Sequence, residues 1–287
     1  MRIRPTALLT EPNRYIREQY RDSRRLSARV YLHQRFSIGP GEWHGWVFDH
    51  LNLSDQAQVL ELGCGTGALW HVNLTRVPAG WSVTLSDLSP GMVSEARDQL
   101  ASTGRELSFA VIDAQAIPLK DQSLDCVIAN HMLYYVPDRD QALSEIRRVL
   151  KASGRLFAAT NGSGHMRELR QLVERCGLGA RWPESHRAFL LEEAPAEVAR
   201  WFGRVEVHRY ESALAIAEVE PLVAYVASLL PDAEAAATSG ALECLRALAA
   251  DEIARRGCIH VTKDTGLLEA CKAPGCATAP PAWARPS

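Results

Sequence analysis

The 287-residue sequence contains no run of about 20 apolar residues of the kind that spans a membrane. Its N-terminal residues include several arginines but no apolar segment behind them, so they lack the pattern of a secretory signal. The net charge is only -2, which gives the molecule no general attraction for nucleic acid or an anionic membrane. These absences predict a cytoplasmic protein without a membrane or nucleic-acid partner.

Cysteine pairs and metal-ligand clusters are also missing from the pattern. The seven cysteines are scattered, and several lie in apolar stretches where a reduced thiol packs as a small hydrophobe. Cys271 and Cys276 are accompanied by no second pair and no histidine at the spacing of a zinc site. We therefore expect neither a disulfide nor a bound metal ion.

Alternating strand and helix patterns follow from about residue 59 onward. Such alternation predicts an α/β fold with a doubly wound, mostly parallel, Rossmann-like sheet of seven strands. Two long strands near the C-terminus enclose a predicted pair of helices. The expected strands are 59–62, 81–87, 107–113, 123–130, 155–160, 205–216 and 258–271, the last interrupted by a turn at 264–266.

The stretch from Val59 to Gly67 is the most informative motif. A short apolar run stops in a turn with glycine at three alternate positions, as expected where backbone must take positive φ or approach a ligand closely. Asp87 and Asp113 end the next two strands, and the carboxyl ends of parallel strands meet at one edge of a sheet. This pattern favours a nucleotide-type site over an ordinary tight turn.

The residues alone leave two cofactors open. Gly63-x-Gly65-x-x-Ala68, with Asp87 about 20 residues further on, also fits the dinucleotide fingerprint, so an NAD-dependent oxidoreductase is one alternative.

Residues 51–162 resemble the class I S-adenosylmethionine-dependent methyltransferases. Their Glu-x-Gly-x-Gly-x-Gly motif is matched in full from Glu61 to Gly67. The resemblance implies that Asp87 binds the ribose hydroxyls, that Leu88 lies beside the adenine, and that Asp113 accepts from the adenine amino group. The implied residues for S-adenosylmethionine are Tyr20, Glu61, Gly63, Gly65, Gly67, Asp87, Leu88, Asp113, Ala114 and Asn130.

The residue patterns and the resemblance together predict a division of the chain. Residues 1–50 are expected to form an N-terminal helical lid, and 51–273 the S-adenosylmethionine-binding methyltransferase domain. A helical insertion is expected at 218–256. The proline-rich residues 274–287 are expected to form a disordered tail.

Two histidines are candidate general bases, His131 first and His165 second. The methyl group of a sulfonium is already activated, so the enzyme mainly aligns a nucleophile, and a base near neutrality assists where the acceptor must lose a proton. His131 follows the fourth strand and His165 follows the fifth, both at the edge where the methyl group is expected. The alternative for each is a histidine that merely lines the pocket.

The expected activity is methyl transfer to an oxygen, nitrogen or carbon of a small molecule, in specialised (natural-product) metabolism. The first 35 residues carry nine arginines against three acidic residues. This basic segment suggests two alternatives, an RNA methyltransferase or an acidic small-molecule acceptor such as a carboxylate or phosphate. Asn130 is not followed by the Pro-Pro-aromatic sequence of amino-directed nucleic-acid methyltransferases, so we prefer the small molecule. A non-catalytic cofactor-binding module is a further alternative, and a homo-oligomer is left open.

Overall fold

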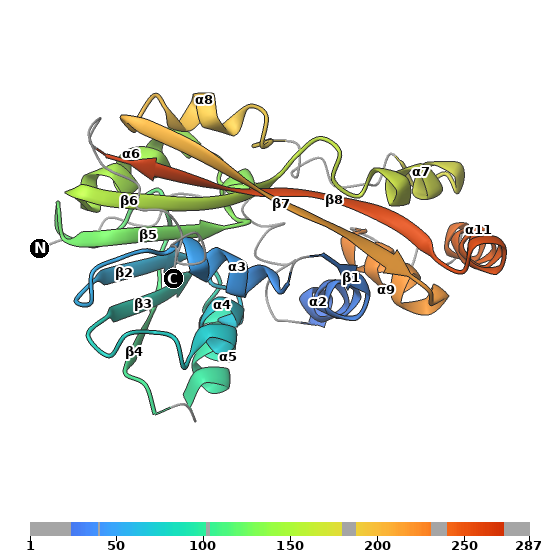
Figure 1. The fold of residues 1–287 in the computed structure, drawn as a ribbon, viewed down its shortest axis with the longest axis horizontal. Helices are drawn as coiled ribbons and strands as arrows, with labels where there is room; N and C mark the ends of the chain where they lie inside the picture. The colour runs from blue at the N-terminus through green and yellow to red at the C-terminus, as the bar shows by residue number, and fades with distance from the viewer. Residues whose placement is uncertain (1–23, 40, 102–103, 180–187, 231–239, 273–287) are drawn as a thin grey trace, which may run out of the picture.

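The computed structural model describes residues 24–39, 41–101, 104–179, 188–230 and 240–272 (Figure 1). They form one sheet in the order β1-β7-β8-β6-β5-β2-β3-β4. The strands from β4 to β6 pair in parallel, whereas β8 is antiparallel to both β6 and β7. The predicted doubly wound, mostly parallel α/β fold is confirmed. The strands are β1 (Ser37–Ile38), β2 (Gln58–Leu62), β3 (Ser82–Asp87), β4 (Leu107–Val111), β5 (Leu124–Asn130), β6 (Leu150–Asn161), β7 (Arg204–Ile216) and β8 (Ile259–Cys271).

The expected count of seven strands is wrong, because β1 adds an eighth. Its two residues pair with Leu214 and Ala213 of β7, and a strand of two residues is too short to show a period-two pattern in sequence. The expected turn within the last strand is also wrong. Gly266 pairs with Thr160 on one side and Arg209 on the other, so β8 runs on without interruption.

Helices bury both faces of the parallel sheet. In β5, Val127 and Ala129 point into one core layer, and Cys126 and Ile128 point into the other. Burial on both faces explains why these strands read as nearly continuous apolar runs. One face is covered by α3 (Trp43–His50), α4 (Ala68–Asn73) and α5 (Pro90–Leu100), the other by α6 (Arg139–Val149) and α8 (Ala194–Val198) (Figure 1).

The two long strands β7 and β8 continue as a ribbon beyond the sheet. β6 pairs with β8 only over residues 265–271, whereas β7 pairs with β8 along the full length of both strands. A third hydrophobic core surrounds the free end of this ribbon (Figure 1). We call the ribbon end and the four helices packed around it the arm. Its helices are α2 (Arg24–Phe36), α7 (Arg167–Arg175), α9 (Val219–Leu229) and α11 (Ala241–Arg256).

A disulfide joins Cys176 to Cys244, so the expectation of no disulfide is wrong. Cys176 follows α7 and Cys244 lies in the first turn of α11, and the packing of these helices brings the two Cα atoms to 5.6 Å. Because 68 residues separate the two cysteines, their pairing is a product of tertiary packing and left no local signal in the sequence.

The described residues cover only part of the expected divisions. Residues 1–23, with Tyr20, and 273–287 lie outside them, so the lid and the tail stay proposals. α9 and α11 lie within the expected insertion at 218–256. None of the helices in the described ranges combines the length and the apolar character needed to cross a membrane.

Candidate functional site

The glycine loop follows β2 at the carboxyl edge of the sheet. Gly63 and Gly65 have φ values of 70° and 53°, in the left-handed region that glycine adopts without strain. A Cβ on Gly63 would lie 2.7 Å from Cβ of Met132, whereas a Cβ on Gly65 would have only Leu26 nearby, at 3.8 Å. Gly63 is therefore needed for packing, and Gly65 leaves open space over the loop.

Gly67, the third glycine of the motif, faces away from this space. A Cβ there would lie 2.9 Å from Cδ1 of Leu100, and Gly67 starts α4 against α5. The position favours helix packing over ligand contact, although the sequence placed Gly67 among the cofactor-binding residues.

Asp87 ends β3 beside the loop. Its Oδ2 accepts from the backbone N–H of Gly65 at 3.0 Å, and its Oδ1 accepts from that of Ser89 at 2.9 Å. Burial raises the pKa of Asp87, while these two N–H groups and that of Leu88 oppose the rise by binding the carboxylate. The residue thus holds the loop in shape and presents its carboxylate to the cavity.

Glu61 lies beneath the loop and is only 2% exposed. Its Oε2 accepts from the indole N–H of Trp70 at 2.7 Å. Burial raises its pKa to about 7, and the nearby charge of Asp87 acts in the same direction. A cationic ligand would favour the ionised form of Glu61, so this carboxyl is suited to a positively charged group.

Asp113 follows β4 and Asn130 ends β5 on the same edge. Oδ1 of Asp113 accepts from the backbone N–H of Gln115 at 2.9 Å and from its side-chain amide at 3.0 Å. The Asn130 amide lies close enough to lower the pKa of Glu61, but within the described ranges neither of its buried polar atoms has a hydrogen-bond partner of acceptable geometry. Unpaired buried amide atoms at a cavity wall indicate a polar ligand.

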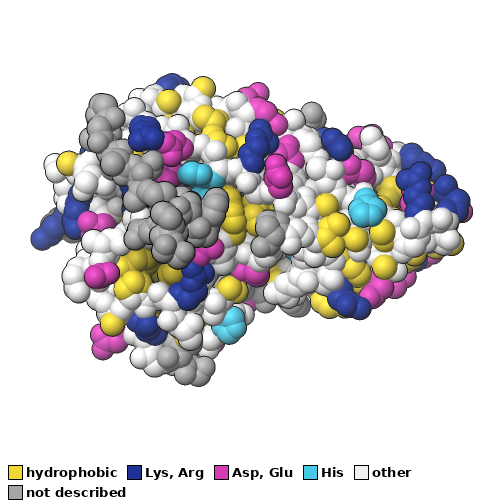
Figure 2. Space-filling view, in the orientation of Figure 1, with side chains coloured by type: hydrophobic (Ala, Val, Ile, Leu, Met, Phe, Trp, Pro, Cys, Tyr) yellow, Lys and Arg dark blue, Asp and Glu magenta, His cyan; other side chains and the backbone are white. Residues whose placement is uncertain are grey.

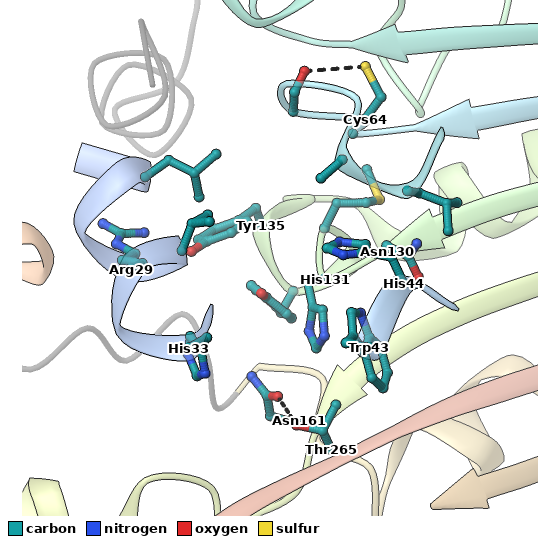
Figure 3. Close-up of a pocket in the computed structure, with 18 of the residues that line it drawn as sticks. Arg29, His33, Trp43, His44, Cys64, Asn130, His131, Tyr135, Asn161 and Thr265 are labelled. Atoms are coloured by element: carbon teal, nitrogen blue, oxygen red, sulfur yellow. Dashed lines mark hydrogen bonds between the residues drawn. The ribbon is translucent and has the colours of Figure 1, made fainter. Parts of the chain in front are cut away.

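These groups line one end of a cavity of about 1170 Å³ that continues to the arm. Figure 3 shows Asn130 and His131 near its centre, with Trp43 beside His131 and the helix α2 on the far side. Leu88 and Ala114 line it as well. The sheet edge, α3, α2 and the ribbon therefore enclose one continuous space.

Both candidate bases line the cavity. His131 has a φ of 51°, and its ring lies 5.3 Å from that of Trp43 and 6.4 Å from that of Tyr134. Nδ1 of His165 lies 3.3 Å from Oγ1 of Thr265 on β8. The structure thus brings both histidines to the same space, His131 from the segment after β5 and His165 from the loop after β6.

Sequence reasoning missed most of the cavity wall that lies outside the parallel sheet. Trp43, Tyr210 and Lys263 line the cavity, as does His33 on α2, yet none of them follows a strand of the parallel sheet. The antiparallel pairing of β8 with β7 and the packing of α2 and α3 place them there, and no local pattern in the sequence reports these events.

The fold and the loop together define a Rossmann-like domain that binds a nucleotide-type cofactor. Residues 60–158 match the family described as "Methyltransferase domain". A malonyl-[acyl-carrier protein] O-methyltransferase from Geobacter sulfurreducens is 36% identical over 158 residues, which cover 53% of this chain and 58% of that protein. The chain therefore carries a class I S-adenosylmethionine-dependent methyltransferase domain, and its cofactor is S-adenosylmethionine.

Solved structures agree on the fold. Phosphoethanolamine N-methyltransferase 2 of Haemonchus contortus, in complex with S-adenosylmethionine, superposes with a TM-score of 0.57 and 20% identity, covering 93% of this chain and 61% of that one. A structure named as the [4+2]-cyclase SpnF gives 0.58 and 20%, covering 94% of this chain and 98% of that one. At such identity the likeness establishes the fold alone. Matches to three curated relatives span about half of their lengths, 58%, 41% and 47%.

The residues at the loop end of the cavity fit this cofactor. Three carboxylates, Glu61, Asp87 and Asp113, suit a ligand with ribose hydroxyls, an amine and two cationic centres, the sulfonium and the ammonium. The open space over Gly65 lets the cofactor approach the backbone closely, and the unpaired amide of Asn130 offers it a polar contact.

Proposed function

We propose that the protein transfers the methyl group of S-adenosylmethionine to an oxygen, nitrogen or carbon nucleophile of a small molecule. The observation that carries this proposal is the single cavity that runs from the glycine loop to the arm. A pocket enclosed by the sheet edge and three other elements suits a small acceptor, which must lie beside the cofactor with water excluded.

In this proposal Asp87, Asp113, Leu88 and Asn130 hold the adenosine, and Glu61 faces the cationic part of the cofactor. The cofactor supplies an activated methyl group when bound. The protein's own residues align the acceptor in line with that group, and positioning of this kind contributes roughly 7–11 kcal/mol.

His165 is our first candidate for a general base. The Thr265 hydroxyl donates to Oδ1 of Asn161 at 2.9 Å, so toward His165 it presents a lone pair (Figure 3). Nδ1 of His165 then carries the proton, which leaves Nε2 as the basic atom. His131 is the second candidate, because it follows β5 directly and lines the same cavity.

Incubation with methyl-labelled S-adenosylmethionine and a panel of phenols, amines and carboxylic acids tests this function. We expect label to appear in a small-molecule product. Transfer to total RNA in the same assay, with no small-molecule product, would favour an RNA methyltransferase. Tight cofactor binding with no transfer to any acceptor would favour a binding module.

A further inference from the structure

The cavity is electrically asymmetric. Its loop end holds Glu61, Asp87 and Asp113, whereas the wall formed by α2, α7 and β8 contributes the cations Arg29, Arg170 and Lys263 and one acid, Glu174. Lys263 lies on β8, two residues before Thr265, and alternate residues of a strand share one face. The cationic cofactor therefore lies at the acidic end, and a positive charge faces the space that remains for the acceptor.

Lys263 has a neutral hydrogen-bond partner but no carboxylate. Its Nζ donates to Oγ of Ser37 at 3.2 Å, and no acid in the described ranges pairs with it. Glu42 is near enough to raise its pKa, but the Glu42 oxygens accept from His44 Nδ1 and from the Gly45 N–H, each at 2.7 Å. Burial nevertheless lowers the pKa of Lys263 to about 8, so the ammonium form is kept at a cost in solvation.

The exposed arginines at the end of the arm differ from Lys263 in having carboxylate partners. Figure 2 shows basic side chains gathered at its end, where α11 carries Arg255 and Arg256. Arg255 pairs with Asp251 at 2.9 Å and with Glu252 at 2.7 Å, and Arg256 pairs with Glu252 at 3.0 Å. Exposed arginines thus have carboxylate partners that the half-buried lysine in the cavity lacks.

His33 on α2 faces the same end of the cavity. Its Nδ1 is buried without a hydrogen-bond partner in the described ranges. Burial, together with the charge of Lys263, lowers its pKa to about 3, so the imidazole is neutral and can donate one hydrogen bond. One ammonium and one neutral donor match a monoanion better than a dianion.

A row of rings connects Lys263 to the loop end. The ring of Tyr210 lies 5.7 Å from Nζ of Lys263, the ring of Trp43 lies 5.2 Å from that of Tyr210, and His131 lies 5.3 Å from Trp43. A wall of this composition favours a flat apolar body between the anionic group and the reacting atom.

We propose that Lys263, with His33 and Ser37, binds the carboxylate of an aromatic acceptor whose ring packs along Trp43 and Tyr210. This inference rests on the proposed methyl transfer and names the substrate class of the same site.

Calorimetric titration of the protein saturated with S-adenosylhomocysteine tests the proposal. The probes are matched acids and amides: benzoate and benzamide, salicylate and salicylamide, indoleacetate and indoleacetamide. We expect at least one acid to bind about tenfold more tightly than its amide, as for hydrogen bonds to a charged group. Lys263→Met should abolish that preference, and Lys263→Arg should retain most of it.

The matched control is Lys272→Met, because Lys272 directly follows β8, the strand that carries Lys263, but donates to the backbone oxygen of Leu150, away from the cavity. Unchanged affinity of Lys263→Met for S-adenosylhomocysteine would show that the fold is intact. Equal binding of acids and amides, no binding of any acid, or a preference that survives in Lys263→Met would overturn the proposal. Failure of the proposed function would appear separately, as no transfer of label from methyl-labelled S-adenosylmethionine to any small-molecule acceptor by the unaltered protein.

Discussion

The carboxylate of Asp87 accepts a hydrogen bond from the backbone N–H of Gly65, with 3.0 Å between Oδ2 and the nitrogen, although 22 residues separate them. The contact forms because β2 and β3 are parallel neighbours, with Leu62 opposite Ser86, so their carboxyl ends lie side by side. The shape of the glycine loop and the position of the acid are therefore one structural unit.

Asp87→Ala should weaken S-adenosylhomocysteine binding by at least tenfold. Each hydrogen bond to a charged group contributes about 1.5–3 kcal/mol, and the substitution removes the carboxylate from both the proposed ribose contact and the loop. Isothermal titration calorimetry measures the effect. Asp87→Asn keeps the shape of the side chain but removes its charge, so it separates the effect of the charge from that of the missing side chain. Near-normal affinity in both variants would refute the assignment of Asp87 to the cofactor site.

Glu61 should make the cofactor-free protein less stable as the pH rises. Its folded-state pKa of about 7 lies above its ordinary value of 4.5, so between these values the folded state holds more protons than the unfolded chain. The free energy of unfolding should fall by up to about 1.4 kcal/mol per pH unit in that window. Urea unfolding of wild type and Glu61→Gln across the window measures the difference.

Glu61→Gln should lose this part of the slope, whereas Glu106→Gln, at an exposed position, should keep it. Asp87 also has a raised pKa, which acts in the same direction in wild type and in Glu61→Gln. The difference between the slopes of these two proteins therefore isolates Glu61. Identical slopes in wild type and Glu61→Gln would contradict the assigned shift.

His165→Ala should lower kcat by about 100-fold or more without changing S-adenosylhomocysteine affinity, as loss of a general base does. Thr265→Val should lower kcat less and shift its pH profile, because the valine cannot accept from Nδ1 of His165. Thr265→Ser should restore the profile. A normal kcat in His165→Ala would contradict the role of His165 as general base and favour His131. His131→Ala provides the comparison.

Removal of the Cys176–Cys244 disulfide should destabilise the protein by about 2–4 kcal/mol, since it closes a long loop in the unfolded chain. Cys176→Ser, Cys244→Ser and the double variant should be equally destabilised, and a reductant should lower the melting temperature of wild type but not of the double variant. Cys258→Ser is the control, because Cys258 is a free cysteine. A wild-type melting temperature that does not respond to the reductant would argue against the bridge.

The cofactor end of the site was predictable because its residues stand where strands end. Glu61, Asp87, Asp113 and Asn130 each follow an apolar strand pattern, and parallel strands bring their carboxyl ends together by topology alone. The parallel strands were predictable from their apolar residues, which form a nearly continuous buried run in β2 and β5 and alternate with polar residues in β3.

The acceptor end was not predictable, because its residues meet only through tertiary packing. Lys263 and Ser37 are 226 positions apart and come together where β1 and β8 flank β7. The disulfide escaped prediction for a similar reason: two helices of the arm must pack before Cys176 can reach Cys244. In Gly67 the sequence motif and the geometry diverge, since helix packing accounts for that glycine.

Thermal unfolding with S-adenosylhomocysteine and with NAD tests the central claim most directly. A ligand that binds only the folded protein stabilises it by about 2.7 kcal/mol at 100 times its Kd. We predict that S-adenosylhomocysteine raises the melting temperature in a concentration-dependent manner, that Asp87→Ala reduces this rise, and that NAD has no effect. A rise with NAD and none with S-adenosylhomocysteine would contradict the account.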